Sequence, residues 1–157
     1  MAPSCCLYRH QLQNFPYKLT IPSLLKRDPE QGVLAACDRL GIAFLPYFPL
    51  ASGLLTGKYR RGQPVPEGSR LASSPNAANQ LTEHNLAIVE ALIQFAEARG
   101  HTILELAVSW LLARPVVASV IAGATKPEQV HANAGAAAWR LTDAELGEID
   151  RIVRQPA

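Results

Sequence analysis

The chain has 157 residues, a length that suits one domain, with 48% hydrophobic and 18% charged residues. This composition is typical of a soluble, globular protein. The net charge is only +2 and the basic residues are scattered, so we expect no nucleic-acid partner. No apolar run is long enough for a membrane helix, so we expect no membrane partner either.

The cysteines indicate the compartment. Cys5, Cys6 and Cys37 are an odd number and lack CxxC spacing, so we expect reduced thiols. No metal-ligand spacing joins them to a histidine, and no metal site is predicted. The first thirteen residues also lack the apolar stretch of a signal peptide. These features predict a cytoplasmic protein.

The first half of the chain predicts one helix and one strand. Residues 1–22 show no sustained hydrophobic period. Asp28 and Pro29 suit the start of a helix, and Gly41 suits its end. The apolar run IAFLPY, residues 42–47, then predicts a strand buried on both faces in a parallel sheet.

Residues 48–80 are rich in glycine and proline and predict a long irregular stretch. Loops of this length are uncommon in compact domains, and those that occur are often functional or disordered. The sequence leaves both interpretations open.

The second half alternates helices with one more strand. Thr82 opens a helix that Gly100 ends, and its apolar face holds Leu86, Val89, Leu92, Ile93 and Ala96. A T-x-x-E capping box then recurs at Thr102, Thr125 and Thr142. Between the first two boxes lies VVASVIAG, residues 116–123, which predicts another buried strand. The alternation predicts an α/β fold with parallel strands.

Two loops follow the carboxyl ends of these strands, where parallel α/β folds bind ligands. In the later loop, a bare glycine backbone precedes a helix start, which attracts anions. The residues that could meet an anion there are Gly123, Thr125, Lys126, Gln129 and Asn133. From the residues alone the favoured interpretation is ordinary helix capping, in which Thr125 caps the helix, Lys126 is solvated, and Gln129 and Asn133 face water.

The earlier loop is YFPLASGLLTGKY, residues 47–59. It is not a P-loop, because Ser52 stands where that motif needs its first glycine and Tyr59 where it needs a serine or threonine. Tyr47 could stack on a flat ring while phosphate lies along the amides near Gly53. Alternatively, the tyrosine belongs to the core and the glycines only make turns.

Together the two stretches resemble the aldo/keto reductase family. YFPLASGLLTGKY is similar to the family's Y-S-P-L-x-x-G-L-L-T-G-K-Y segment. The stretch from residue 116 is similar to its I-x-G-x-x-x-P-E-Q-x-x-x-N segment followed by L-T-x-x-E-L, and SLLKRDPEQGVLAACDRLGIAFLPY to the preceding helix and strand. The resemblance runs from about Ser23 to Val153. It implies a partial TIM (β/α)8 barrel, made of about the sixth to the eighth strands with their helices.

The resemblance also implies a cofactor and its contacts. Members transfer hydride between NADPH and a small-molecule carbonyl, an aldehyde or ketone. By analogy Tyr47 would stack on the nicotinamide, with Phe48, Leu50, Gly53 and Lys58 along the pyrophosphate. The adenosine 2′-phosphate and adenine would meet Gly123, Ala124, Thr125, Lys126, Gln129 and Asn133.

The chain departs from the family pattern in two respects. The catalytic Asp, Tyr, Lys and His lie in the first half of family members, and no stretch here matches those segments, so no catalytic residue is assigned. Leu19 stands where the family has a glutamine. We therefore expect a divergent segment, residues 1–22, followed by a cofactor-binding half barrel, residues 23–157.

Two functions fit this expectation. One is a truncated, NADP(H)-binding oxidoreductase domain without its catalytic residues. The alternative is a non-catalytic nucleotide-binding or interaction module that pairs through open barrel edges, as a homo-oligomer or with a partner chain completing the barrel.

Overall fold

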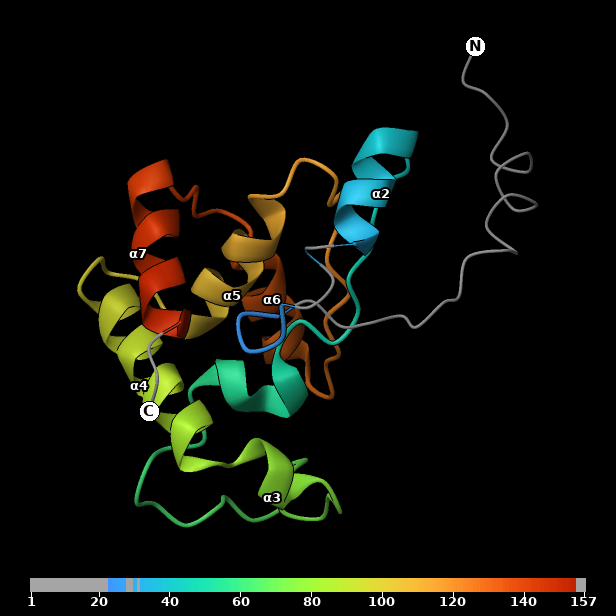
Figure 1. Cartoon of the computed structure of the whole chain (residues 1–157). Helices are drawn as coiled ribbons and strands as arrows, with labels where there is room; N and C mark the ends of the chain where they lie inside the picture. Colours follow the sequence, from blue (N-terminus) through green and yellow to red (C-terminus); the bar gives the residue numbers. More distant parts are fainter. Residues whose placement is uncertain (1–22, 28–29, 31, 155–157) are drawn as a thin grey trace.

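A computed structural model of the chain describes residues 23–27, 30 and 32–154. Figure 1 shows its elements, which are α2 (Val33–Leu40), the 3-10 segment η2 (Ala51–Thr56), α3 (Ala77–Gln80), α4 (Glu83–Glu97), α5 (Ile103–Leu112), α6 (Pro127–Gly135) and α7 (Asp143–Arg154). None of the helices in the described part of the chain combines the length and apolarity needed to cross a membrane.

Threonine caps fix the starts of α4, α5 and α7, as the sequence predicts. The Thr82 hydroxyl accepts a 3.1 Å hydrogen bond from the backbone three residues on. Thr102 and Glu105 form both bonds of a capping box. Thr142 and Glu145 form the same two bonds before α7. Each box satisfies backbone donors that the helix leaves unpaired.

The capping box predicted for α6 is wrong. Thr125 lies one position too early, and the N-cap is Lys126, which makes no side-chain cap bond. The cause is Pro127, which lacks an N–H and suits the first helical position. A residue before proline is held in the extended region, as the φ of −141° and ψ of 148° at Lys126 show.

Helix α2 ends as predicted at Gly41, whose φ of 62° is left-handed. It begins at Val33, after Gly32. Asp28 and Pro29, the predicted start, lie outside the described residues, as do residues 1–22.

The two predicted strands pair in parallel but only at isolated positions. Phe44 bridges Val117, and Tyr47 bridges Ile121. One segment therefore advances by three residues (44 to 47) and the other by four (117 to 121), which places one extra residue in the later segment. We call these two paired segments, residues 44–47 and 117–121, the ribbon.

The prediction that both faces of the ribbon are buried is wrong. Pro46 and Val117 are buried. Leu45 and Ile121 are about half exposed. The described part of the chain therefore buries less of these two apolar runs than the sequence predicts.

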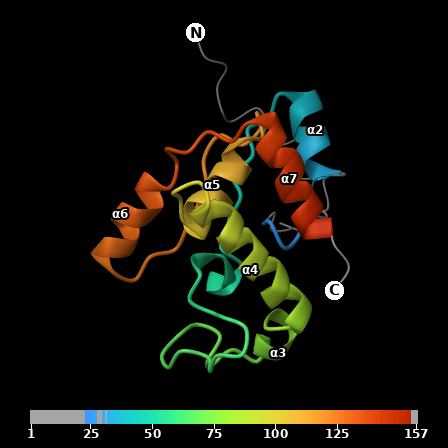
Figure 2. The ribbon, with the colours of Figure 1, turned by 90° about the vertical axis from the view of Figure 1, so that its left-hand side faces the viewer.

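The core lies between α4, α5, α7 and the loop after the ribbon (Figure 1). α4 contributes the apolar face that its sequence predicts, and Trp110 of α5 is one of the largest buried side chains. Figure 2 shows α6 at one side of the molecule, away from α4 and α7. No residue of α6 is buried.

The long loop is anchored to the core. Tyr59 is buried, and its hydroxyl accepts a 3.1 Å hydrogen bond from the backbone of Leu71, which is also buried. Arg60 forms a 2.9 Å ion pair with Glu90 of α4. These contacts favour a packed loop over a loose insertion.

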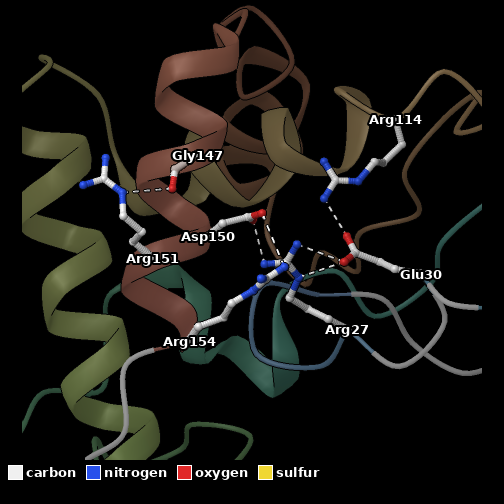
Figure 3. A network of polar contacts seen from close by, with 7 residues as sticks. All are labelled: Arg27, Glu30, Arg114, Gly147, Asp150, Arg151 and Arg154. Atoms are coloured by element: carbon white, nitrogen blue, oxygen red, sulfur yellow. Dashed lines mark hydrogen bonds and ion pairs between the residues drawn. The ribbon is translucent and has the colours of Figure 1, made fainter.

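A polar network ties the first described segment to the last helix (Figure 3). Arg27 pairs with Glu30 at 2.9 Å and with Asp150 of α7 at 2.7 Å. Glu30 also accepts from Arg114. The guanidinium groups of Arg27 and Arg114 lie 5.1 and 4.3 Å from the ring centre of Trp110, within range of cation–π attraction.

Candidate functional site

The parallel pairing of Tyr47 with Ile121 fixes where the two candidate loops begin. Both segments run in the same direction, so the loops that follow them leave from the same end of the ribbon. The two stretches singled out in the sequence are therefore neighbours in space, although more than sixty residues separate them along the chain. We call residues 48–58 the first loop and residues 122–129 the second loop.

The first loop has an unusual backbone. Phe48, Ala51 and Ser52 have positive φ values of 73°, 46° and 58°, and Gly53 follows at 92°. Residues other than glycine rarely adopt this region, and such strain persists only where the surroundings impose it. Here the constraint comes from Leu54 and Leu55, which are fully buried and anchor the loop in the core.

Lys58 is held against this backbone. A Cβ atom at Gly53 would lie 2.8 Å from Cε and 2.9 Å from Nζ of Lys58, so the ammonium group rests directly over the glycine. The same nitrogen lies 5.1 Å from the ring centre of Tyr59. The exposed Lys58 thus places a positive charge above the half-buried Gly53, an arrangement suited to an anionic group.

The structure adds a contact that sequence reasoning missed. The guanidinium of Arg70 lies 4.7 Å from the ring centre of Phe48. This contact ties the long loop back to the first loop. No local pattern marks Arg70, because the contact joins positions 22 residues apart.

The second loop is closed by a glutamine. The Gln129 side-chain oxygen accepts hydrogen bonds from the backbone N–H of Thr125 at 2.7 Å and from its hydroxyl at 3.2 Å. Gln129 therefore shapes the turn, and only its amide NH₂ is left to face a ligand. Lys126 is exposed and has no ion pair with any described residue.

The remaining predicted residues lie around these turns. A Cβ at Gly123 would meet no atom within 4 Å, so open space adjoins the backbone there, and Ala124 is exposed beside it. Asn133 is half-buried and lines a cleft of about 390 Å³ between α5, α6 and the ribbon. Gln129 and Asn133 therefore lie in different places, Gln129 at the turn and Asn133 at the cleft, although they are only one helical turn apart.

A second cleft, of about 300 Å³, borders the first loop. Phe48 and Ala51 line it together with Lys26. Leu50 accepts hydrogen bonds from Gly53 and Leu55 through its carbonyl, so its role in the first loop is to close the turn.

The charge of the two loops favours an anion. Residues 48–58 and 122–129 contain two lysines and one carboxylate, Glu128, so their net charge is +1. Their amides and ammonium groups share one end of a parallel ribbon, which is where α/β folds bind phosphate-bearing ligands. The fold and the loops together define an α/β protein with a phosphate-compatible strand end.

The chain belongs to the aldo/keto reductase family. The sequence profile of that family matches residues 17–154, which is most of the chain. The family fold is a (β/α)8 barrel, in agreement with the parallel pairing of two segments that helices connect along the chain.

Characterised relatives support this assignment. An L-glyceraldehyde 3-phosphate reductase from Escherichia coli O157:H7 is 36% identical over 130 residues, which cover 79% of this chain and 37% of the relative. Aldo-keto reductase yakc [NADP(+)] from Schizosaccharomyces pombe is 32% identical over 139 residues, which cover 88% of this chain and 39% of the relative.

A solved structure matches in three dimensions. A glycerol dehydrogenase from Gluconobacter oxydans superposes with a TM-score of 0.70 at 31% identity, covering 84% of this chain and 41% of its own. The present chain therefore spans about two fifths of the length of the relatives it matches.

Proposed function

We propose that this chain binds NADP(H) at the end of the ribbon, with the first loop along the pyrophosphate and the second loop at the adenosine 2′-phosphate. The observation that carries the proposal is the Tyr47–Ile121 bridge, which makes the two loops neighbours. Support for the choice of cofactor comes from the family and from the relative whose name includes NADP(+).

The side chains of the two loops suit a bound NADP(H). Lys58 above Gly53 supplies one positive charge, and Lys126 supplies a second that forms no ion pair with a described residue. Open space beside Gly123 leaves room for a ligand. Tyr47, at the end of the ribbon, is 40% exposed to solvent, and its ring would stack on the flat nicotinamide.

In the reaction of the family, a bound nicotinamide supplies hydride to a carbonyl carbon. We propose that this chain contributes cofactor binding to that chemistry and that the proton donor lies in the part of the family barrel that the chain lacks. The relative named for L-glyceraldehyde 3-phosphate supports a small aldehyde as the substrate class, and the one named for glycerol supports a small alcohol for the reverse direction.

Calorimetry with NADPH and NADH tests the site. These two ligands differ only in the 2′-phosphate. Lys126→Met should weaken NADPH binding about tenfold, because a lost charge-assisted contact costs about 1.5 kcal/mol, and should leave NADH binding unchanged.

The matched control is Arg154→Met, which removes the same charge from an exposed position at the end of α7. It should change neither affinity. Equal weakening of both ligands by Lys126→Met, or no binding of NADPH by the parent chain, would refute the proposed site.

The catalytic part of the proposal has its own test. The purified chain, incubated with NADPH and a small aldehyde, should show no turnover above the rate without protein. Turnover at a rate typical of enzymes, about 1 s⁻¹ or faster, would mean that a proton donor lies within this chain.

A further inference from the structure

The turn between α4 and α5 carries a histidine that stacks on a tryptophan from a distant part of the chain. The ring centres of His101 and Trp139 lie 4.1 Å apart, and the two rings are inclined by only 8°. Trp139 also lies beside Phe95 of α4, with 6.3 Å between the ring centres. The tryptophan is therefore held by the last turns of α4 and by the turn that follows them.

Trp139 belongs to the connection between α6 and α7, residues 136–142. This connection attaches α6 to the core, because α6 buries none of its own residues. Ala136, directly after α6, is buried, and its carbonyl accepts a 3.3 Å hydrogen bond from the Ser109 hydroxyl of α5. The stack on His101 is a second attachment, three residues further along. How firmly Trp139 is held therefore bears on how firmly α6 is held.

Carboxylates outnumber cations around the imidazole. Glu105 of α5 lies 3.4 Å from Nδ1 of His101. The backbone hydrogen bond of its capping box is the main cause that lowers the pKa of Glu145 of α7, and the charge of a protonated His101 is a smaller cause. Arg99, after α4, pairs with Glu145 at 3.4 Å and with Glu148 at 2.7 Å. Three carboxylates thus stand against one guanidinium while His101 is neutral.

Protonation of the imidazole would strengthen these contacts. Histidine normally gains its proton between about pH 8 and pH 5. The protonated ring of His101 is a cation, which the face of Trp139 and the excess of carboxylates both attract. Glu105 and Glu145 stay ionised in this range, because backbone hydrogen bonds lower the pKa of each from 4.5. Arg140, the charged residue of the connection, is exposed, and solvent screens its charge.

We propose that His101 is a pH-sensitive latch, whose protonation tightens the stack on Trp139 and so fixes the α6–α7 connection, and with it α6, to the core. Because α6 begins within the second loop, the latch makes the support of that loop depend on pH. The proposal rests on the contacts of α4, α5 and α7 and is independent of cofactor binding.

Hydrogen exchange at two pH values tests the proposal. Protection factors, which correct for the intrinsic pH dependence of exchange, are measured on the full chain at about pH 5.5 and about pH 8, on either side of histidine titration. Protection of α6 and of residues 136–139, relative to the buried middle of α4, should be about threefold higher at the lower pH, the size of a cation–π attraction at a partly exposed site. His101→Gln should abolish this difference.

The matched control is His84→Gln, which removes an exposed imidazole from the first turn of α4. It should keep the difference between the two pH values. Loss of the difference in this control as well would assign it to general titration and overturn the proposal. Equal protection at both pH values in the parent chain, or weaker protection at the lower pH, would also overturn it.

A pH titration of the parent chain by NMR gives a measurement that needs no variant. The imidazole resonances of His101 and the indole N–H resonance of Trp139 should move along one curve with a common midpoint. The indole resonance of Trp110, which is buried in the core, should stay in place over the same range. A Trp139 resonance that does not respond while His101 titrates would overturn the proposal.

Discussion

Gly53 combines two requirements at one position. Its φ of 92° is unfavourable for any side chain, and a Cβ there would approach within 2.8 Å of Lys58. Gly53→Ala should therefore lower the free energy of unfolding by about 1–2 kcal/mol. It should also displace the lysine and weaken NADPH binding. Urea unfolding and calorimetry measure the two effects separately.

Gly147 provides the matched control. It lies inside α7, and a Cβ there would meet no atom within 4 Å. Gly147→Ala should stabilise the protein by about 0.5–1 kcal/mol, because alanine loses less backbone freedom in a helix. If Gly53→Ala and Gly147→Ala changed the free energy of unfolding in the same direction, backbone strain at Gly53 would not explain the effect of Gly53→Ala.

At the scale of elements, the capping boxes of α5 and α7 predict acid sensitivity. Hydrogen bonds from the Thr102 and Thr142 backbones are the main cause that lowers the pKa of Glu105 and Glu145 from the ordinary value of 4.5. A carboxylate with a lowered pKa in the folded state stabilises the protein above pH 4.5, and this stabilisation disappears as pH falls through the folded pKa. Unfolding free energies should therefore decrease below pH 4.5.

The glutamine variants isolate this effect. Glu105→Gln and Glu145→Gln keep a side chain that can complete the capping box but cannot titrate. In urea titrations from pH 7 to pH 3, the double variant should show a shallower loss of stability below pH 4.5. An unchanged slope would assign the acid sensitivity to other carboxylates.

Helix α6 should be the least stable helix of more than two turns. It buries no side chain, whereas α4 buries seven residues, and short helices depend on tertiary packing. Hydrogen exchange should be much faster in α6 than in α4, and NADPH should slow it by contact with the second loop. Equal protection of both helices without ligand would contradict this account of α6.

The elements also show what sequence reasoning can reach. Caps are local signals, so Thr82, Thr102 and Thr142 located three helix starts. At Thr125 the same pattern gave a wrong prediction, because Pro127 takes the first helical position and makes Lys126 the N-cap. The sequence predicted more burial of the ribbon than the structure shows. An apolar run indicates that a strand is suited to a buried place, but it does not show which other segments cover the strand. The Arg70–Phe48 contact had no local signal at all.

At the scale of the whole molecule, Arg27 joins segments 123 residues apart (Figure 3). Its side chain is only 17% exposed and pairs with Glu30 and Asp150. Arg27→Met should lower the free energy of unfolding by about 2 kcal/mol, because two partly buried carboxylates lose a partner. Arg61→Met removes an ion pair of which both partners are mostly exposed, and should cost less than about 0.5 kcal/mol. If Arg27→Met and Arg61→Met lowered the free energy of urea unfolding equally, the contacts of Arg27 with Glu30 and Asp150 would not stabilise the fold beyond an exposed ion pair.

The central claim is that two loops, distant in sequence, act together on one dinucleotide. A titration of the ¹⁵N-labelled chain with NADPH, followed by amide chemical shifts, tests it most directly. We expect resonances of residues 50–58 and 123–129 to shift together along one binding curve, while those of α4 stay in place. Shifts confined to one loop, or two curves with different midpoints, would contradict the account.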